Sequence, residues 1–567
     1  MSTLDWLVMC SFLTFVVSYG TWKTRKTKDI DSYIRAGRTS RWWTIALSIM
    51  ATQASAITFL STPGQAYVDG MRFVQFYLGL PIAMIILSVT AVPLYNKLNV
   101  FTAYEYLEKR FDLKNRMLGS ALFLTQRGLA AGFTIYAPAL ILSIILGWEI
   151  NITIILIGTM VILYTTVGGT NAVNKTHLLQ MIIITAGMFS AFITTYLLLP
   201  QDVSVIDAAY IAGKLGKLNA IDFSFDLSNR YTFWSGIIGG TFLMLSYFGT
   251  DQSQVQRYLS GSSIAESRMG LLANGIVKVP MQFIILFIGA MVFVFYQFVT
   301  PPLSFNTVET KNIKNSSYAV EYNKLEVEYD NIYKEKQETI RQLLTSIESG
   351  DEDLVDQKTK EMLAEQNEAS LIREEALGLI QEANPDAETN DTNYIFLTFI
   401  INFLPIGLVG LVLAAILSAS MSSTSAELNA LATTSIIDFY KRLVKKEASS
   451  THYLKASKAA TVFWGIYAIT FALFAHHLGS LIEAVNILGS LVYGTILGIF
   501  LTAFYLKKVT GTPTFIAALV AETVILYFYF FTEIPFLWYN VIGCILVIIL
   551  SLLISSFLKM NEKVINN

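Results

Sequence analysis

The chain has 567 residues, of which 54% are hydrophobic and 14% are charged, whereas about a quarter of the residues in a soluble protein are charged. This composition, with a mean hydropathy of +0.52, excludes an ordinary soluble domain, and a formal net charge of −2 gives no indication of a nucleic-acid partner. The two cysteines, Cys10 and Cys544, both lie in apolar runs, where we expect them to be packing residues.

Apolar runs of roughly 20 residues recur along almost the whole chain, which is typical of a polytopic α-helical membrane protein. We therefore predict an all-α fold with about thirteen membrane spans. We expect the first span to be a retained helix rather than a cleaved signal peptide. The predicted spans are residues 5–22, 42–61, 72–95, 116–147, 150–168, 177–199, 233–256, 271–298, 404–438, 457–475, 480–506, 512–532 and 535–558.

Basic residues concentrate in alternate loops, and loops rich in Lys and Arg stay in the cytoplasm. This pattern predicts an extracytoplasmic N-terminus and a cytoplasmic C-terminus. We expect a multi-pass protein of the cell membrane, with a bacterial inner membrane favoured over a eukaryotic plasma membrane. The basic residues are Lys23, Arg25, Lys26 and Lys28 after the first span, Lys441, Arg442, Lys445 and Lys446 after the ninth, and Lys507 and Lys508 after the eleventh.

Residues 303–392 interrupt the apolar pattern and hold about half of the 42 Asp and Glu residues of the chain. Apolar residues at a spacing of three to four on each side of SGDED predict a helical hairpin of coiled-coil type. The predicted topology places this insertion outside the cell, between a first transmembrane part, 1–302, and a second, 393–567. A solvated accessory segment and an arm that docks an unknown partner are both compatible with it.

Several predicted spans contain polar side chains, which are costly in lipid and usually face a cavity or the interior of a helix bundle. No Gly or Pro interrupts residues 43–62, so propensity predicts no break in the second span. The polar residues there are Thr52, Gln53, Ser55 and Thr58, and the fourth and eighth spans add Gln126, Arg127 and Lys278.

The ninth span contains the hydroxyl-rich stretch LSASMSSTSAELNA, residues 417–430. In a helix, the side chains of Ser422 and Ser423 lie near the carbonyl of Ala419, three and four residues earlier. One carbonyl and two hydroxyls would form an uncharged oxygen patch, which suits a monovalent cation supplemented by carbonyls of an unwound neighbour. Alternatively, these small residues let helices pack closely and bond back to their own carbonyls.

Several longer stretches resemble the sodium/solute symporter family. They are AGRTSRWWTIALSIMATQASAITFLSTPGQAY, ILYTTVGGTNAVNKTHLLQ, DQSQVQRYL and FLPIGLVGLVLAAILSASMSSTSAELNALATTSIIDFYKR. The stretches AYEYLEKRF and IYAPALIL are most similar to the iodide, multivitamin and monocarboxylate branch. The resemblance implies a LeuT-like fold of two inverted five-helix repeats, and solute import driven by inward sodium flow through alternating access.

The resemblance also implies where sodium binds. The family's main site uses carbonyls of a broken first core helix and hydroxyls of the eighth core helix. By position, the carbonyl donors are Ala51, Ala54 and Ala419, and the hydroxyl donors are Ser422 and Ser423. These include the oxygens that helical geometry brings together.

A second family site holds sodium with an Asp in a W-T-D-x-x-Q motif. The matching stretch here is KTHLLQ, so His177 replaces that Asp, although Ser425 remains. An imidazole is a poor ligand for an alkali cation, and we therefore expect one sodium per cycle. His177 is then either a proton-sensitive element or a hydrogen-bonding residue near the cytoplasmic end.

A typical hexose site is not expected, because the acidic–amide pair of sugar-transporting relatives becomes Ile57 and Thr58, and their sugar-binding Glu becomes Tyr77. A guanidinium in mid-membrane requires an anionic partner, and for Arg127 this is a solute carboxylate or Asp251. The residues expected around the solute are Gln53, Thr58, Tyr77, Arg127, Asp251, Ser253, Lys278 and Asn486.

These residues predict a sodium-coupled importer of a small organic anion, such as a monocarboxylate or a sugar acid. The alternatives are a symporter of a neutral sugar or polyol and a transporter-like sensor. A channel suits the distribution of polar residues less well. No HExxH or GxSxG motif occurs, and we expect no enzyme activity. The expected partners are the solute, sodium and the lipid bilayer.

Overall fold

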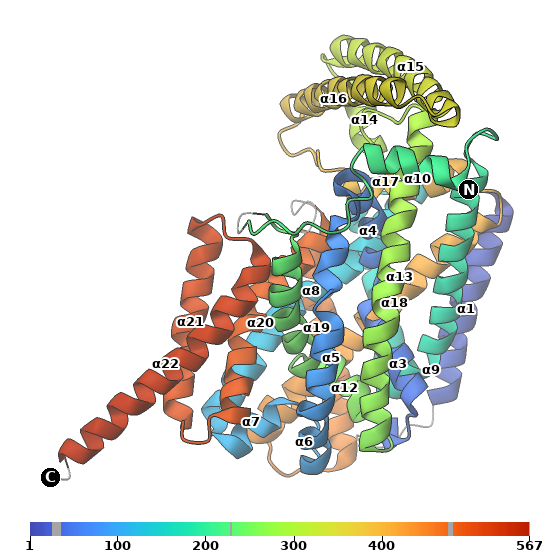
Figure 1. Ribbon diagram of the computed structural model, residues 1–567. Coiled ribbons are helices and arrows are strands. Elements are labelled where there is room, and N and C mark those ends of the chain that lie inside the picture. The colour runs from blue at the N-terminus through green and yellow to red at the C-terminus, as the bar shows by residue number, and fades with distance from the viewer. Residues whose placement is uncertain (25–33, 35, 227–228, 475–479, 566–567) are drawn as a thin grey trace.

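The computed structural model describes residues 1–24, 34, 36–226, 229–474 and 480–565. Of the basic residues used for topology, Arg25, Lys26 and Lys28 fall outside these ranges, and the side chain of Lys23 is not described. Long helices form a bundle with the two termini at opposite ends, and α14, α15 and α16 lie beyond the end that carries the N-terminus (Figure 1).

Helices account for nearly all of the regular structure. Among the described residues, nine helices are long and apolar enough to cross a membrane. The first part contains α1 (Thr3–Thr24), η1 (Ala36–Arg38), α3 (Trp42–Gln53), α4 (Ala56–Asp69), η2 (Gly70–Tyr77), α5 (Leu80–Val89), α6 (Ala91–Leu98), α7 (Tyr104–Arg110), α8 (Leu113–Leu146), α9 (Ile150–Leu197), α10 (Val205–Lys214), η3 (Ser235–Gly239), α11 (Gly240–Gly249), α12 (Gln252–Leu259) and α13 (Ile264–Phe298). The rest contains α14 (Thr307–Lys314), α15 (Ala319–Ser349), α16 (Glu352–Ala383), α17 (Thr392–Phe403), α18 (Leu408–Thr434), η4 (Ser435–Val444), α19 (Ser450–Ala472), α20 (Leu481–Tyr505), α21 (Gly511–Phe531) and α22 (Phe536–Ile565).

Helix α18, which carries the hydroxyl-rich stretch, lies at the centre of the bundle. It packs against α9, α8 and α1, and all of its residues from 412 to 434 are buried. Alanine and serine dominate this stretch, and such small side chains let neighbouring backbones approach closely. By contrast, α21 exposes large apolar side chains such as Phe530 and Phe531, as a helix at the edge of a membrane bundle does.

The predicted second span is broken at its middle. Helix α3 ends at Gln53, Ala54 has a ψ of 79°, and the extended Ser55 precedes α4. The N–H of Ser55 donates to Gln53 (3.1 Å) instead of to the carbonyl of Ala51 four residues back. The Ala51 carbonyl thereby loses its usual helical partner. Propensity did not predict this break, whereas the family resemblance implied it.

A second break divides the predicted span at 233–256, because α11 ends at Gly249 and α12 begins at Gln252. Thr250 and Asp251 are non-helical. Both donors of Ser253 reach the carboxylate of Asp251, the N–H at 2.8 Å and the hydroxyl at 2.6 Å. An Asp that caps a new helix in this way competes with continuation of the preceding one.

The acidic segment forms α14 and two long helices, α15 and α16, that pack together. Gly350 ends α15 with a left-handed φ of 71°, and the carboxylate of Asp351 caps α16 by accepting the N–H of Leu354 at 3.1 Å. These two residues make the sharp reversal. The buried apolar residues shared by the two helices include Tyr322, Leu325, Tyr329, Ile332, Ile372, Ala376 and Leu379.

The hairpin is attached to the bundle at both ends. Near its turn, Ile340, Leu343 and Met362 form an apolar cluster with Ile211 of α10. At its base, the guanidinium of Arg373 binds both oxygens of Asp391, at 2.6 and 2.7 Å. These contacts hold the hairpin against the end of the bundle.

Candidate transport site

A cavity of about 80 Å³ lies where α4, α8, α11, α18 and α20 meet beside the break in the second span. This volume holds only a few water molecules. Five of the predicted solute residues line it: Gln53, Thr58, Tyr77, Arg127 and Asn486. The other lining residues are Thr52, Ser55, Ile57, Phe76, Gln126, Thr134, Leu243, Met244, Tyr247, Glu427, Ile482, Val485 and Tyr493.

The three remaining predicted solute residues lie behind the cavity wall. Ser253 holds Asp251, as described above, and Asp251 in turn contacts Arg127. Lys278 is fully buried on α13, and its ammonium lies 5.9 Å from the centre of the Tyr77 ring. Asp251 and Ser253 thus hold Arg127 in place, and neither they nor Lys278 line the cavity.

Two carboxylates share the guanidinium of Arg127, which is 3% exposed. Its Nε lies 3.0 Å from Asp251, its Nη2 also contacts Asp251 and Tyr493, and its Nη1 lies 3.1 Å from Glu427. Of the two partners expected from the sequence, the structure therefore shows the internal acid. It adds a second acid that was not expected.

Glu427 is the main site residue that the sequence analysis missed. It lies within LSASMSSTSAELNA and is 5% exposed. The signal was present, since an ionisable residue inside a predicted membrane span is a candidate functional residue by default. The spacing of the serines before it predicted a cation site, and that prediction did not involve the acid.

Of the residues predicted to bind sodium, Ser422 on α18 contacts Ala51 on α3. The hydroxyl of Ser422 lies 3.1 Å from the carbonyl of Ala51, which the helix break has freed. The hydroxyl of Ser423 lies 3.1 Å from the carbonyls of Ala419 and of Ser420. All of these residues and Ala54 are buried. Neutral carbonyl and hydroxyl oxygens from two helices are the donor set that an alkali cation requires.

His177 and Ser425 are both fully buried. The Nδ1 atom of His177 lies 2.9 Å from the hydroxyl of Ser48 on α3, and the hydroxyl of Ser425 donates to the carbonyl of Ser422 at 3.1 Å. The backbone of Ser422, whose carbonyl accepts from Ser425, also interacts with His177. His177 on α9 thus contacts both α3 and α18.

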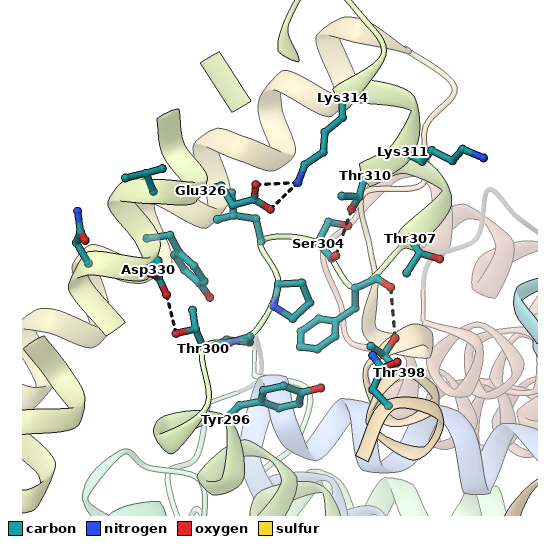
Figure 2. A pocket seen from close by; sticks show the side chains of 18 of the residues that line it. Tyr296, Thr300, Ser304, Thr307, Thr310, Lys311, Lys314, Glu326, Asp330 and Thr398 are labelled. Atoms are coloured by element: carbon teal, nitrogen blue, oxygen red, sulfur yellow. Dashed lines mark hydrogen bonds and ion pairs between the residues drawn. The ribbon is translucent and has the colours of Figure 1, made fainter. Parts of the chain in front are cut away.

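A larger cavity of about 1050 Å³ lies outside the bundle, between α14, α15 and the ends of α13 and α17. Figure 2 shows Lys314 paired with Glu326 at 2.7 Å and Thr300 donating to Asp330 at 3.1 Å, whereas Lys311 points away from these pairs. Asp330 also pairs with Lys334 at 2.6 Å. Because this cavity lies outside the bundle and neither of the two helix breaks described above reaches it, it is not the transport site.

The profile of the Sodium:solute symporter family matches residues 33–320 and 376–521. The sodium/sialic acid symporter NanT of Aliivibrio fischeri is 24% identical over 566 residues, which cover 99% of this chain and 94% of that protein. The human sodium-coupled monocarboxylate transporter 1 is 33% identical over 276 residues, or 48% of this chain and 44% of that protein.

A solved structure described as the substrate-bound outward-open state of a Na+-coupled sialic acid symporter is similar in fold. Its TM-score is 0.75 at 22% identity, over 98% of each chain. The helix breaks and the buried oxygen patch agree with this fold. The chain therefore belongs to the sodium:solute symporter family and is a multi-pass, sodium-coupled solute symporter with a LeuT-like fold, not an enzyme.

Proposed function

We propose that the chain imports a small organic anion of the sugar-acid or monocarboxylate class together with sodium. The observation that carries this proposal is the guanidinium of Arg127 on the wall of the cavity, where it can bind a carboxylate. The amides of Gln53 and Asn486 and the hydroxyl of Thr58 line the same cavity and can bind solute hydroxyls. Relatives aligned over nearly their whole length are named sodium/sialic acid symporters, which supports a sugar acid.

A neutral sugar or polyol is the second candidate. Arg127 already holds Asp251 and Glu427, so a solute without a charge would leave this arrangement undisturbed. The two candidates differ in whether the solute's carboxylate is required for uptake.

For the coupling ion, we propose one sodium per cycle. It binds to the carbonyls of Ala51, Ala54 and Ala419 and the hydroxyls of Ser422 and Ser423. The contact of Ser422 with the freed carbonyl of Ala51 supports this set. A sodium-dependence curve with a Hill coefficient near one is expected, and a coefficient near two would require a second site.

For the topology, we propose thirteen spans with the N-terminus outside and the C-terminus in the cytoplasm of a bacterial inner membrane. Residues 303–392 then form an extracytoplasmic domain between transmembrane parts 1–302 and 393–567. The termini at opposite ends of the bundle and the hairpin at the N-terminal end support this orientation (Figure 1). This orientation is tested in intact cells by labelling single cysteines introduced on α15 and in the loop after η4.

The function is tested with the purified protein in proteoliposomes. We expect an inward sodium gradient, but not a potassium gradient, to drive uptake of N-acetylneuraminate or lactate. Glucose or inositol, which carry no charge, are not expected to be taken up or to compete. Sodium-driven uptake of glucose or inositol alone would favour the neutral-solute candidate.

A further inference from the structure

We propose that Glu427 is a proton-binding site whose carboxylate occupies, on Arg127, the place that the solute carboxylate takes. Each solute anion is then imported with one proton in addition to sodium. The inference rests on the proposed function, because it needs an anionic solute, but it concerns a different ion and a different residue.

The two acids on Arg127 are held very differently. Both oxygens of Asp251 are saturated: Oδ1 accepts the N–H and hydroxyl of Ser253, and Oδ2 accepts from Arg127 and from the hydroxyl of Tyr493 at 2.8 Å. Glu427 accepts one bond on each oxygen, from Nη1 of Arg127 at 3.1 Å and from the hydroxyl of Thr134 at 2.9 Å. Asp251 is therefore the permanent counter-ion of Arg127, and Glu427 is the exchangeable one.

The charges around Arg127 point to a proton. With both acids ionised, two negative charges already face one positive charge inside the bundle. A solute carboxylate at Nη1 would raise this to three against one, in a place where unpaired charge is very costly. Protonation of Glu427 keeps the local charge constant while the solute enters. The other groups that face or approach this cluster are Tyr247, Tyr493 and Thr134, with Lys278 behind Tyr77.

The exchange needs only the making and breaking of one O–H bond. A proton from external water binds the Glu427 carboxylate, and its ion pair with Nη1 breaks. The solute carboxylate then forms an ion pair with Nη1 of Arg127. On the cytoplasmic side the solute leaves, Glu427 releases its proton to water and rejoins Arg127.

The size of the cavity and the position of Glu427 fit this exchange. Binding sites for small molecules usually measure about 300 Å³ or more, whereas the cavity measures about 80 Å³ with Glu427 in its wall. Movement of this side chain vacates the space beside Nη1. Glu427 also follows Ser423 by four residues on α18, so one helix carries both the proposed sodium hydroxyls and the proton site.

The test measures uptake and proton flux together in proteoliposomes loaded with a pH-sensitive dye. N-acetylneuraminate is the probe, because its neutral form is scarce and does not leak across the bilayer. For the wild type we expect sodium-driven uptake to acidify the lumen. The apparent affinity of the wild type for N-acetylneuraminate should tighten by up to about tenfold for each unit of pH decrease in the range where Glu427 titrates.

Glu427→Gln imitates the protonated acid. We expect it to retain sodium-driven uptake, to bind the probe at least fivefold more tightly than the wild type at pH 7.5, and to show neither the pH dependence nor the acidification. Glu522→Gln is the matched control, since Glu522 also lies in an apolar helix, α21, but does not line the cavity. It should behave like the wild type.

Several results would overturn the inference. Wild-type uptake without acidification does so even if the Glu427→Gln variant fails to fold. Acidification and pH dependence that persist in Glu427→Gln also overturn it, and both results leave the proposed function intact. If sodium drives uptake of neither N-acetylneuraminate nor lactate by the wild type, the proposed function fails and the inference fails with it.

Discussion

Arg127 in the helix bundle and Arg373 at the base of the hairpin are both paired with carboxylates, but the pairing differs. Arg373 holds a single acid, Asp391, with bonds to both of its oxygens. Its Nε donates to the carbonyl of Leu303 at 3.1 Å, and Asp391 also accepts the N–H of Phe305 at 2.7 Å. Charges are matched one to one, and the surrounding backbone takes up the remaining bonds.

Arg127 has one acid more than charge balance requires. A matched and saturated pair such as Arg373–Asp391 has no reason to rearrange, whereas a cation shared by two acids can exchange one of them for another anion. The difference indicates that Arg373 joins two parts of the structure, and that Arg127 serves transport. Changes at the two arginines should therefore have different effects.

Replacing Arg127 by Lys should cause the largest loss. An ammonium group is a point charge without the planar fork of a guanidinium, and it cannot hold two carboxylates in the same geometry. Breaking such a buried network costs about 3 kcal/mol or more. We expect sodium-driven uptake to fall at least fiftyfold per amount of reconstituted protein. The matched change Arg373→Lys should alter uptake less than twofold. Equal losses in the two variants would contradict the comparison.

Replacing Ser422 by Ala should weaken sodium binding within the same bundle. The loss of one proposed oxygen ligand should raise the sodium concentration for half-maximal uptake about tenfold, or roughly 1.4 kcal/mol. Ser418→Ala is the control, because this serine lies on the same helix but outside the proposed ligand set. A normal sodium dependence in Ser422→Ala would place the ion elsewhere.

Replacing Arg373 by Met should loosen the hairpin and spare transport. The carboxylate of Asp391 would lose its charged partner, at a cost of about 1–3 kcal/mol. Hydrogen exchange of residues 303–318 in the full-length protein should become faster, while uptake changes less than twofold. Uptake that falls in parallel with the loosening would show that the hairpin takes part in transport.

The smallest effect concerns pH and Lys336 on α15. Burial lowers the pKa of Lys336 to about 7, although the nearby Glu365 opposes the shift. Between about pH 7 and pH 10 the unfolded hairpin therefore binds a proton that the folded hairpin does not. The free energy of unfolding should rise with pH in this window, by of order 1 kcal/mol per unit.

This dependence is checked by urea unfolding of the full-length protein at pH 7 to 9. A fluorophore pair on α15 and α16 reports the unfolding of the hairpin. Lys336→Met should remove the dependence. Glu388 acts mainly below this window and with the opposite sign: burial raises the pKa of Glu388 to about 7, so its contribution to stability is lost as pH rises through 7. A wild-type hairpin equally stable at pH 7 and pH 9 would contradict the assignment.

Hydropathy alone predicted the spans and the acidic segment, but it read residues 233–256 as continuous because the break there depends on Asp251 capping a new helix. The break at Ala54 has no Gly or Pro to signal it, and it was expected only from the family resemblance.

By itself, the sequence determined that this is a membrane protein with polar residues inside its spans, because burial in lipid constrains the composition of each stretch of about 20 residues. The tertiary structure decided which of those residues meet. Arg127 and Glu427 are 300 positions apart and yet lie 3.1 Å from each other. Such a contact depends on the rotation and depth of α8 and α18 in the bundle, and hydrophobic patterning does not record these.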